Sequence, residues 1–307
     1  MPAMNEAGLV IAIFGPTASG KSFVAEALAA RIPAEPVSAD SMQAYAGLPI
    51  LTNQSGQPAR LVGIWPLAHE GSVGEYQRLA HAAIDEILSL GRTPIVVGGT
   101  GLYLRAALAD LDIPPSPPPG SRERWEETYR RLGPEHTHEL LAERDPAAAA
   151  AVHPNDARRV VRALELHETG SSLRPERSLL WTEATRHPTL IVGLDVPRDV
   201  LHERIAARTH EMFERGVEEE VRRALEQPIG VTAGQIIGLR TVGGLPPEAA
   251  AAELERQTRR YAAYQRKWLR RLPGAVTLRA DRPAGEVADE ILEVARARQR
   301  LPARRAG

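Results

Sequence analysis

The sequence predicts an α/β fold in which a parallel sheet is flanked by helices and an all-α subdomain is inserted into the chain. Three observations support this class. Strand-like apolar runs alternate with helical periodicity, a glycine-rich loop joins the first run to the first helix, and a proline-rich window is followed by helical segments with no clear strand before Leu190. We therefore expect a core formed by residues 1–113 and 187–307, with the insertion at residues 114–186.

The glycine-rich loop has the spacing G-x-x-x-x-G-K-[ST], after an apolar run at residues 9–14 and before a helix that reaches about residue 30. Such a loop, a P-loop, wraps backbone N–H groups around phosphate, while its lysine neutralises charge and its last hydroxyl can hold Mg²⁺. The residues are Gly15, Pro16, Thr17, Ala18, Ser19, Gly20, Lys21 and Ser22, with Ser22 as the expected metal ligand. The core should therefore be P-loop NTPase-like. The loop alone names no reaction, because kinases, motors and other transferases all bind di- or triphosphates this way.

The next segments return the chain to the sheet. Residues 36–43 predict a short buried strand that ends in polar residues, and in a parallel sheet this places Asp40 in the same crevice as Lys21. Residues 46–74 predict a loop with a short strand at 61–65, followed by a helix at 75–90 and a strand at 94–97. The glycines after this strand, Gly98–Gly101, serve either the site or close packing between strand and helix.

Five prolines lie between Pro114 and Gly120, which predicts a stiff linker. The remaining elements follow from periodicity and turn residues. We expect helices at residues 121–132, 137–143 and 156–168, a strand at 190–195, helices at 198–225 and 247–272, a strand at 275–278, and a final helix from 284.

Composition limits the class of protein. With 307 residues, 43% of them hydrophobic, the chain can form one large domain and a smaller one. Cysteine is absent, which excludes disulfides and thiolate zinc sites, and no long apolar segment predicts a membrane helix. We expect a cytoplasmic protein without membrane contact. The net charge of -1 leaves nucleic-acid binding open, because arginines can be concentrated locally.

Two helices concentrate arginines. Arg158, Arg159 and Arg162 have helical spacing that puts them on one face. In the helix near the C-terminus, seven basic residues surround three aromatic ones, Tyr261, Tyr264 and Trp268. The aromatic residues can equally be core and the arginines a solvated face. Two such faces in one chain favour a bound polyanion that is held through its phosphates.

Together these motifs resemble the tRNA dimethylallyltransferases, also called tRNA isopentenyltransferases. The markers, in order, are GPTASGKS at Gly15–Ser22, SADSMQAY at Ser38–Tyr45, VGGTGLY at Val97–Tyr103, HPNDARRVVRALE at His153–Glu165, RGVEEEVR at Arg215–Arg222 and TRRYAAYQRKWLRR at Thr258–Arg271. The resemblance implies transfer of a dimethylallyl group from dimethylallyl diphosphate to the exocyclic N6 amine of the adenosine at position 37, 3′-adjacent to the anticodon of a tRNA, forming N6-isopentenyladenosine.

The resemblance also implies roles for single residues. Asp40 would be the general base, Thr100 would lie near the transferring group, Arg222 would bind the leaving diphosphate, and Lys21 and Ser22 would hold it with Mg²⁺. The stretches that match tRNA contacts comprise Asp40, Ser41, Met42, Gln43, Thr100, Arg122, Arg158, Arg159, Val160, Val161, Arg162, Gln235, Ile236, Ile237, Gly238, Leu239 and Arg240. The partner would be a tRNA anticodon stem-loop, bound by a monomer.

Two stretches depart from the family. Where its members usually continue with a Gly-Thr-Ala-Lys-Pro run and paired histidines, this chain has Leu51–Ser55 and Ala59–Val62, and Gly238–Thr241 differs from the usual Gly-Tyr-Lys-Glu. Two other functions fit the P-loop. One is a small-molecule kinase in which Asp40 activates a hydroxyl, and the other is an RNA-binding protein that uses nucleotide as a switch. The arginine-rich insertion argues against the kinase, and the lack of a clear Walker-B carboxylate argues against the switch.

Overall fold

The structure is a computed structural model that describes residues 8–114, 117–118, 120–173 and 179–300. The chain divides into two compact units, one formed by residues 1–110 and 183–307 and the other by residues 111–182. The sequence placed the insertion at 114–186, and three residues of its proline-rich window, at 115, 116 and 119, lie outside the described residues.

The larger unit is built on a five-stranded parallel sheet with the strand order β2-β3-β1-β4-β5. The strands are β1 (Val10–Phe14), β2 (Ala34–Ser38), β3 (Thr93–Gly98), β4 (Thr189–Asp195) and β5 (Val276–Arg279). The predicted α/β class is therefore confirmed. The chain adds β2 and β3 on one side of β1, and then adds β4 and β5 on its other side. Parallel sheets open a ligand crevice at such a point, beyond the carboxyl ends of the strands.

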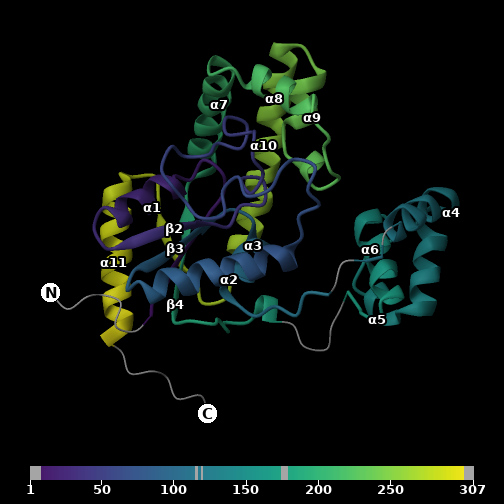
Figure 1. Ribbon diagram of the computed structural model, residues 1–307, viewed down its shortest axis with the longest axis horizontal. Coiled ribbons are helices and arrows are strands. Elements are labelled where there is room, and N and C mark those ends of the chain that lie inside the picture. The colour runs from purple at the N-terminus through teal and green to yellow at the C-terminus, as the bar shows by residue number, and fades with distance from the viewer. Residues whose placement is uncertain (1–7, 115–116, 119, 174–178, 301–307) are drawn as a thin grey trace. The chain divides into compact units, whose positions relative to one another are not determined.

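Helices cover both faces of this sheet. Ile11 and Ile13 of β1 share a core cluster with α1 (Lys21–Ala29) and α11 (Ala284–Arg300), which lie side by side in Figure 1. The alternate residues of β1 are also buried and point to the opposite face, because side chains alternate along a strand. That face is covered by α2 (Val73–Ser89) and α3 (Gly101–Leu108).

A second layer of helices packs together at the top of Figure 1, also within the larger unit. It comprises α7 (Arg198–Glu214), α8 (Val217–Leu225), α9 (Leu239–Gly244) and α10 (Pro247–Leu269), and a 3₁₀ turn at Ala233–Gln235 precedes α9. The sequence predicted one helix over residues 198–225, which is wrong. Gly216 adopts a φ of 84°, a left-handed conformation that ends α7 and begins α8.

The predicted strand at residues 61–65 is also wrong. Isolated bridges flank it, one from Arg60, just before the stretch, to Val37 and one from Trp65, at its end, to Tyr45. The stretch has no continuous partner strand. Its backbone therefore makes isolated hydrogen bonds to nearby loop residues, such as the one from Trp65 N to Ala44 O.

The smaller unit is helical and has a core of its own. It contains α4 (Ser121–Arg144), α5 (Pro146–Ala149), α6 (Ala157–Glu168) and a 3₁₀ turn at Leu179–Trp181. The long α4 is interrupted by non-helical backbone at Gly133, before Pro134, where the sequence predicted two separate helices. Trp125, Leu141, Val160 and Leu164 are among the residues that pack in this core.

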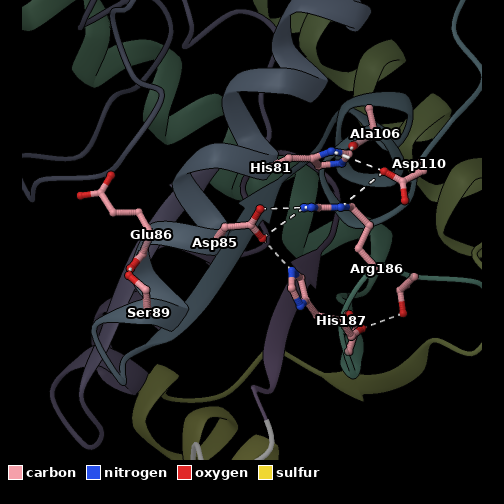
Figure 2. Close-up of polar contacts among 10 residues, drawn as sticks. His81, Asp85, Glu86, Ser89, Ala106, Asp110, Arg186 and His187 are labelled. Atoms are coloured by element: carbon pink, nitrogen blue, oxygen red, sulfur yellow. Dashed lines mark hydrogen bonds and ion pairs between the residues drawn. The ribbon is translucent and has the colours of Figure 1, made fainter.

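A polar cluster fastens both core ends of the insertion to α2 (Figure 2). Arg186, where the chain has returned from the smaller unit, donates two hydrogen bonds to Asp85, at 3.3 and 3.1 Å. Its backbone N–H donates to the carbonyl of Leu108, and its Nε lies 3.4 Å from Asp110, where the chain leaves the larger unit. The exit and re-entry points are therefore held next to each other by α2.

Within the described residues, no helix combines the length and the apolar character needed to cross a bilayer.

Candidate functional site

The loop Gly15–Ser22 joins β1 to α1 and closes around its own lysine. Gly20, with a φ of 87°, caps α1, so the loop turns its backbone toward the helix N-terminus. Lys21 Nζ donates to the carbonyl oxygens of Gly15 at 3.0 Å and Pro16 at 2.8 Å. The hydroxyl of Ser19 is buried and has no hydrogen-bond partner among the described residues. A ligand with several anionic oxygens would supply the missing acceptors.

The electrostatics of the site centre on Lys21 and Asp40. Burial lowers the pKa of Lys21 to about 8; the charge of Asp40 opposes this shift, and the guanidinium of Arg208 adds to it. Asp40 follows β2, where the backbone N–H of Ala39 donates to Val97 O on the neighbouring strand. The parallel sheet thus brings Asp40 and Lys21 together, as the sequence predicted.

Asp40 begins a short turn that carries the next predicted residues. One of its carboxylate oxygens accepts a hydrogen bond from Met42 N at 2.9 Å. Ser41 contacts Thr100 through both its backbone N–H and its hydroxyl, each at 3.3 Å from Thr100 Oγ1. Thr100 Oγ1 also lies 3.3 Å from the hydroxyl of Tyr261, whose pKa is raised by burial, so that it stays protonated. The network orients groups next to Asp40.

A cavity of about 1050 Å³ lies within the larger unit and joins the phosphate loop to Asp40. Its basic side chains come from the loop, from α7 and the residue that follows it, and from Arg282 after β5, and its apolar side chains come from several segments. The basic residues include Lys21, Arg204, Arg208 and Arg215, and the apolar ones include Met42, Leu51, Met212, Ile237 and Leu254. The cavity therefore offers both cationic and apolar side chains in its lining, which suits a phosphorylated compound with a hydrocarbon tail.

Two side chains at this site were missed by the sequence reasoning, and the first is Gln265. A Cβ at Gly99 would lie 2.1 Å from Gln265 Nε2, and one at Gly101 would lie 2.2 Å from the Trp268 ring, so both glycines are needed for close packing of α10. Gln265, which is 1% exposed, accepts from Thr17 N at 2.7 Å and donates to Gly99 O at 3.0 Å. It ties the phosphate loop to the turn that carries Thr100.

The second missed side chain is Arg208. It lines the cavity, and burial lowers its pKa while the charge of Asp40 opposes this. The sequence predicted a charged helix after the strand at residues 190–195. Helical spacing alone does not identify which arginine of that helix faces the cavity.

Arg222, predicted from the resemblance to bind diphosphate, lies elsewhere. It is exposed on α8, where it forms ion pairs with Glu219 and Glu226, and it is not among the residues that line the cavity. The structure brings Arg208 rather than Arg222 to Asp40 and Lys21, and a catalytic role for Arg222 stays a prediction.

The predicted tRNA contacts of the larger unit fall into two groups. Asp40, Met42, Gln43 and Ile237 line the cavity, and Ser41 and Thr100 stand next to Asp40. Among residues 235–240, which run into the first turn of α9, Gln235 and Arg240 are exposed, whereas Ile236, Gly238 and Leu239 are buried.

The predicted contacts of the smaller unit are divided in the same way. Arg158 and Arg159 are exposed at the start of α6. Arg122 and Arg162 both form ion pairs with the buried carboxylate of Glu165, at 3.1 and 3.2 Å. The side chains of Val160 and Val161 pack in the helical core. Among these predicted contacts of the smaller unit, Arg158 and Arg159 therefore provide most of the exposed positive charge.

Comparison with known protein families matches residues 43–272 to the model described as IPP transferase. The chain is 42% identical over 294 residues to the tRNA dimethylallyltransferase of Thermobifida fusca, covering 89% of this chain and 91% of that protein. It is 43% identical over 287 residues to the tRNA dimethylallyltransferase of Streptomyces coelicolor, with the same coverage of 89% and 91%.

Two solved structures are also similar. The full-length tRNA isopentenylpyrophosphate transferase of Bacillus halodurans aligns with a TM-score of 0.67 and 31% identity, covering 96% of this chain and 98% of that one. A eukaryotic dimethylallyltransferase captured acting on tRNA aligns with a TM-score of 0.76 and 26% identity, covering 97% of this chain and 82% of that one.

Proposed function

The chain belongs to the IPP transferase family, and we propose on that premise that it transfers a dimethylallyl group from dimethylallyl diphosphate to the N6 amine of adenosine 37 of tRNA. The product is N6-isopentenyladenosine, and diphosphate is released. The observation that carries the proposal is the cavity that Asp40 and the phosphate loop line together, with apolar side chains in the same lining.

On the nucleophile side, we propose Asp40 as the general base. The exocyclic amine of adenine is a weak nucleophile, because its lone pair is delocalised into the ring. A carboxylate that takes up the amine proton as the new C–N bond forms assists the attack. The hydrogen bond from Met42 N holds one oxygen of Asp40. The charge of Asp40 acts to raise the pKa of Lys21, Arg208 and Tyr261, so these groups lie close enough to interact with it.

On the leaving-group side, negative charge grows on the diphosphate as the allylic C–O bond breaks. The loop N–H groups, the Lys21 ammonium and the Arg208 guanidinium can all stabilise this charge. The Ser22 hydroxyl and the Asp40 carboxylate line the same cavity and are oxygen donors of the kind that Mg²⁺ prefers. Mg²⁺ held there would neutralise diphosphate charge. Among the described residues no cluster of three His, Asp or Glu side chains could hold a metal alone, so most ligands would come from diphosphate and water.

For the tRNA, exposed arginines on α6 support contacts with phosphates of the anticodon stem-loop. An adenosine in a single-stranded loop leaves its stack at low cost, which lets it enter a cavity. Action as a monomer and a cytoplasmic location stay predictions.

The family assignment favours this function over the small-molecule kinase. A direct test incubates the protein with an unmodified tRNA, Mg²⁺ and either dimethylallyl diphosphate or ATP, and then analyses the nucleosides by mass spectrometry. The proposal predicts a nucleoside heavier by one isopentenyl group with dimethylallyl diphosphate only. Absence of this product under conditions where the protein binds both substrates would refute it.

A further inference from the structure

The cavity wall includes a segment whose role the sequence left unexplained. Residues 51–57 line the cavity, and they lie where the chain departs from the usual family pattern. The segment has turns but no regular helix or strand. Local turn hydrogen bonds, such as that from Thr52 N to Leu48 O, shape the segment, and contacts with other elements fix its place in the cavity wall.

Glu220 on α8 holds this segment through its backbone. One carboxylate oxygen accepts a hydrogen bond from Ile50 N and the other accepts one from Leu51 N, both at 2.7 Å. Glu220 is 6% exposed, whereas Glu218 and Glu219 on the same helix are exposed. A buried carboxylate is costly unless it is hydrogen-bonded, and two short bonds to N–H groups satisfy it.

The same segment is also held by Gln43. Its side-chain amide donates to the carbonyl oxygens of Thr52 and Asn53, at 3.2 and 3.1 Å. Gln43 follows Asp40 in the turn after β2. The segment is thus fixed between the turn of the general base and α8.

Leu51 is the apolar member of this wall. Its side chain is 6% exposed. A Cβ placed on Gly238 would lie 2.7 Å from both Leu51 Cδ1 and Leu254 Cδ1, so these two leucines converge on the same spot. Both belong to the apolar lining of the cavity.

We propose that Glu220 is a positioning residue that fixes Leu51 as a wall of the substrate cavity and thereby limits the length of prenyl chain accepted. The inference rests on the proposed function, since it concerns the diphosphate substrate of that same site. Glu220 acts through the backbone of Ile50 and Leu51 and does not itself contact the substrate. Loss of its carboxylate leaves buried N–H groups unpaired, and the wall relaxes outward.

The test compares Glu220→Gln with Glu218→Gln, which makes the same change at an exposed position of α8. Glutamine keeps the size of the side chain but can accept from only one of the two N–H groups. For Glu220→Gln we expect the KM for dimethylallyl diphosphate to rise about tenfold, as for the loss of roughly one methylene of apolar contact between the wall and the substrate, with a much smaller change in kcat. Use of geranyl diphosphate relative to dimethylallyl diphosphate should increase, and Glu218→Gln should match the wild type in both measurements.

Hydrogen exchange supplies a readout that does not depend on catalysis. The amides of Ile50 and Leu51 should exchange faster in Glu220→Gln than in Glu218→Gln. Faster exchange with unchanged KM and unchanged chain-length preference would overturn the proposal, because Glu220 would then hold the segment without affecting the substrate. Unchanged exchange would overturn it as well.

If Glu220→Gln does not fold, Leu51→Ala tests the wall from the other side. It should increase the relative use of geranyl diphosphate, and an unchanged preference in the folded variant would overturn the proposal. A wild-type protein that transfers no prenyl group would refute the proposed function instead, so the two failures are distinguishable.

Discussion

The substitution Gln265→Glu changes one buried contact between α10 and the phosphate loop. Gln265 accepts from Thr17 N and donates to Gly99 O, so both halves of its amide are used. An ionised carboxylate of the same size can still accept from Thr17 N. It cannot donate to Gly99 O, and it places negative charge against that carbonyl and beside the diphosphate site.

The magnitude follows from the lost bond and the carbonyl left unpaired. Together they should cost about 2–3 kcal/mol of unfolding free energy at neutral pH. For a unit of this size this corresponds to a fall in Tm of roughly 4–12 °C. Burial and the facing carbonyl disfavour the charged form, so the pKa of the new carboxyl is raised. Stability is therefore retained at pH values below the unfolded pKa, about 4.3, and is lost as the pH rises through the folded pKa.

Calorimetric Tm measurements at pH 5 and pH 7.5 test this reasoning, with Gln227→Glu, at an exposed position, as the matched control. Gln265→Glu should lose more stability at pH 7.5 than at pH 5, and its affinity for diphosphate at pH 7.5 should fall about tenfold if the displaced loop loses one hydrogen bond to the anion. A Tm equal to that of the control at both pH values would refute the bridging role. A deficit that grew at lower pH would refute the assignment of Gln265 as donor to Gly99.

Three further predictions concern other parts of the chain. Asp40→Asn should bind dimethylallyl diphosphate and tRNA normally but transfer about 10²–10⁴-fold more slowly in single-turnover kinetics; near-wild-type transfer would remove Asp40 as the base. Replacing both Arg158 and Arg159 by glutamine should reduce the slope of log tRNA affinity against log salt by up to about 2, while an unchanged slope would mean that this face does not contact tRNA. Although burial acts in the opposite direction, hydrogen bonds from Arg186 and His187 hold the pKa of Asp85 below its ordinary value, so its contribution to stability is present at neutral pH and lost as the pH falls through the folded pKa. Thermal unfolding of Asp85→Asn should therefore differ from the wild type at pH 7 and converge with it below about pH 4, and a constant difference would contradict the assignment.

Local patterns predicted most of the fold. The apolar run into Gly15–Ser22 and the alternation of strands and helices were enough for the α/β class, because these signals act over a few residues. These local patterns failed where the structure depends on contacts with residues distant in the sequence or on a single backbone conformation. Residues 61–65 have strand composition but no neighbouring strand to pair with, and the charged run at residues 198–225 hides the break at Gly216.

For the site, the sequence likewise predicted some of the residues and missed others. Asp40 and Lys21 could be placed together because strand ends of a parallel sheet converge, whatever the side chains around them. Arg208 and Gln265 could not, because each lies on a helix with many polar residues and periodicity does not identify the one that faces the cavity. Within RGVEEEVR the resemblance pointed to Arg222, whereas the buried polar side chain of that motif is Glu220.

The sequence by itself determined the phosphate loop, the sheet that carries it and the family of the chain, because these depend on the order and spacing of residues along one strand, loop or helix. Only the tertiary structure decided which side chains complete the cavity. Gln265 reaches Thr17, and Glu220 reaches Ile50, across separations of 248 and 170 residues. Such contacts depend on how α8 and α10 pack against loops formed much earlier in the chain, and no local pattern encodes that packing.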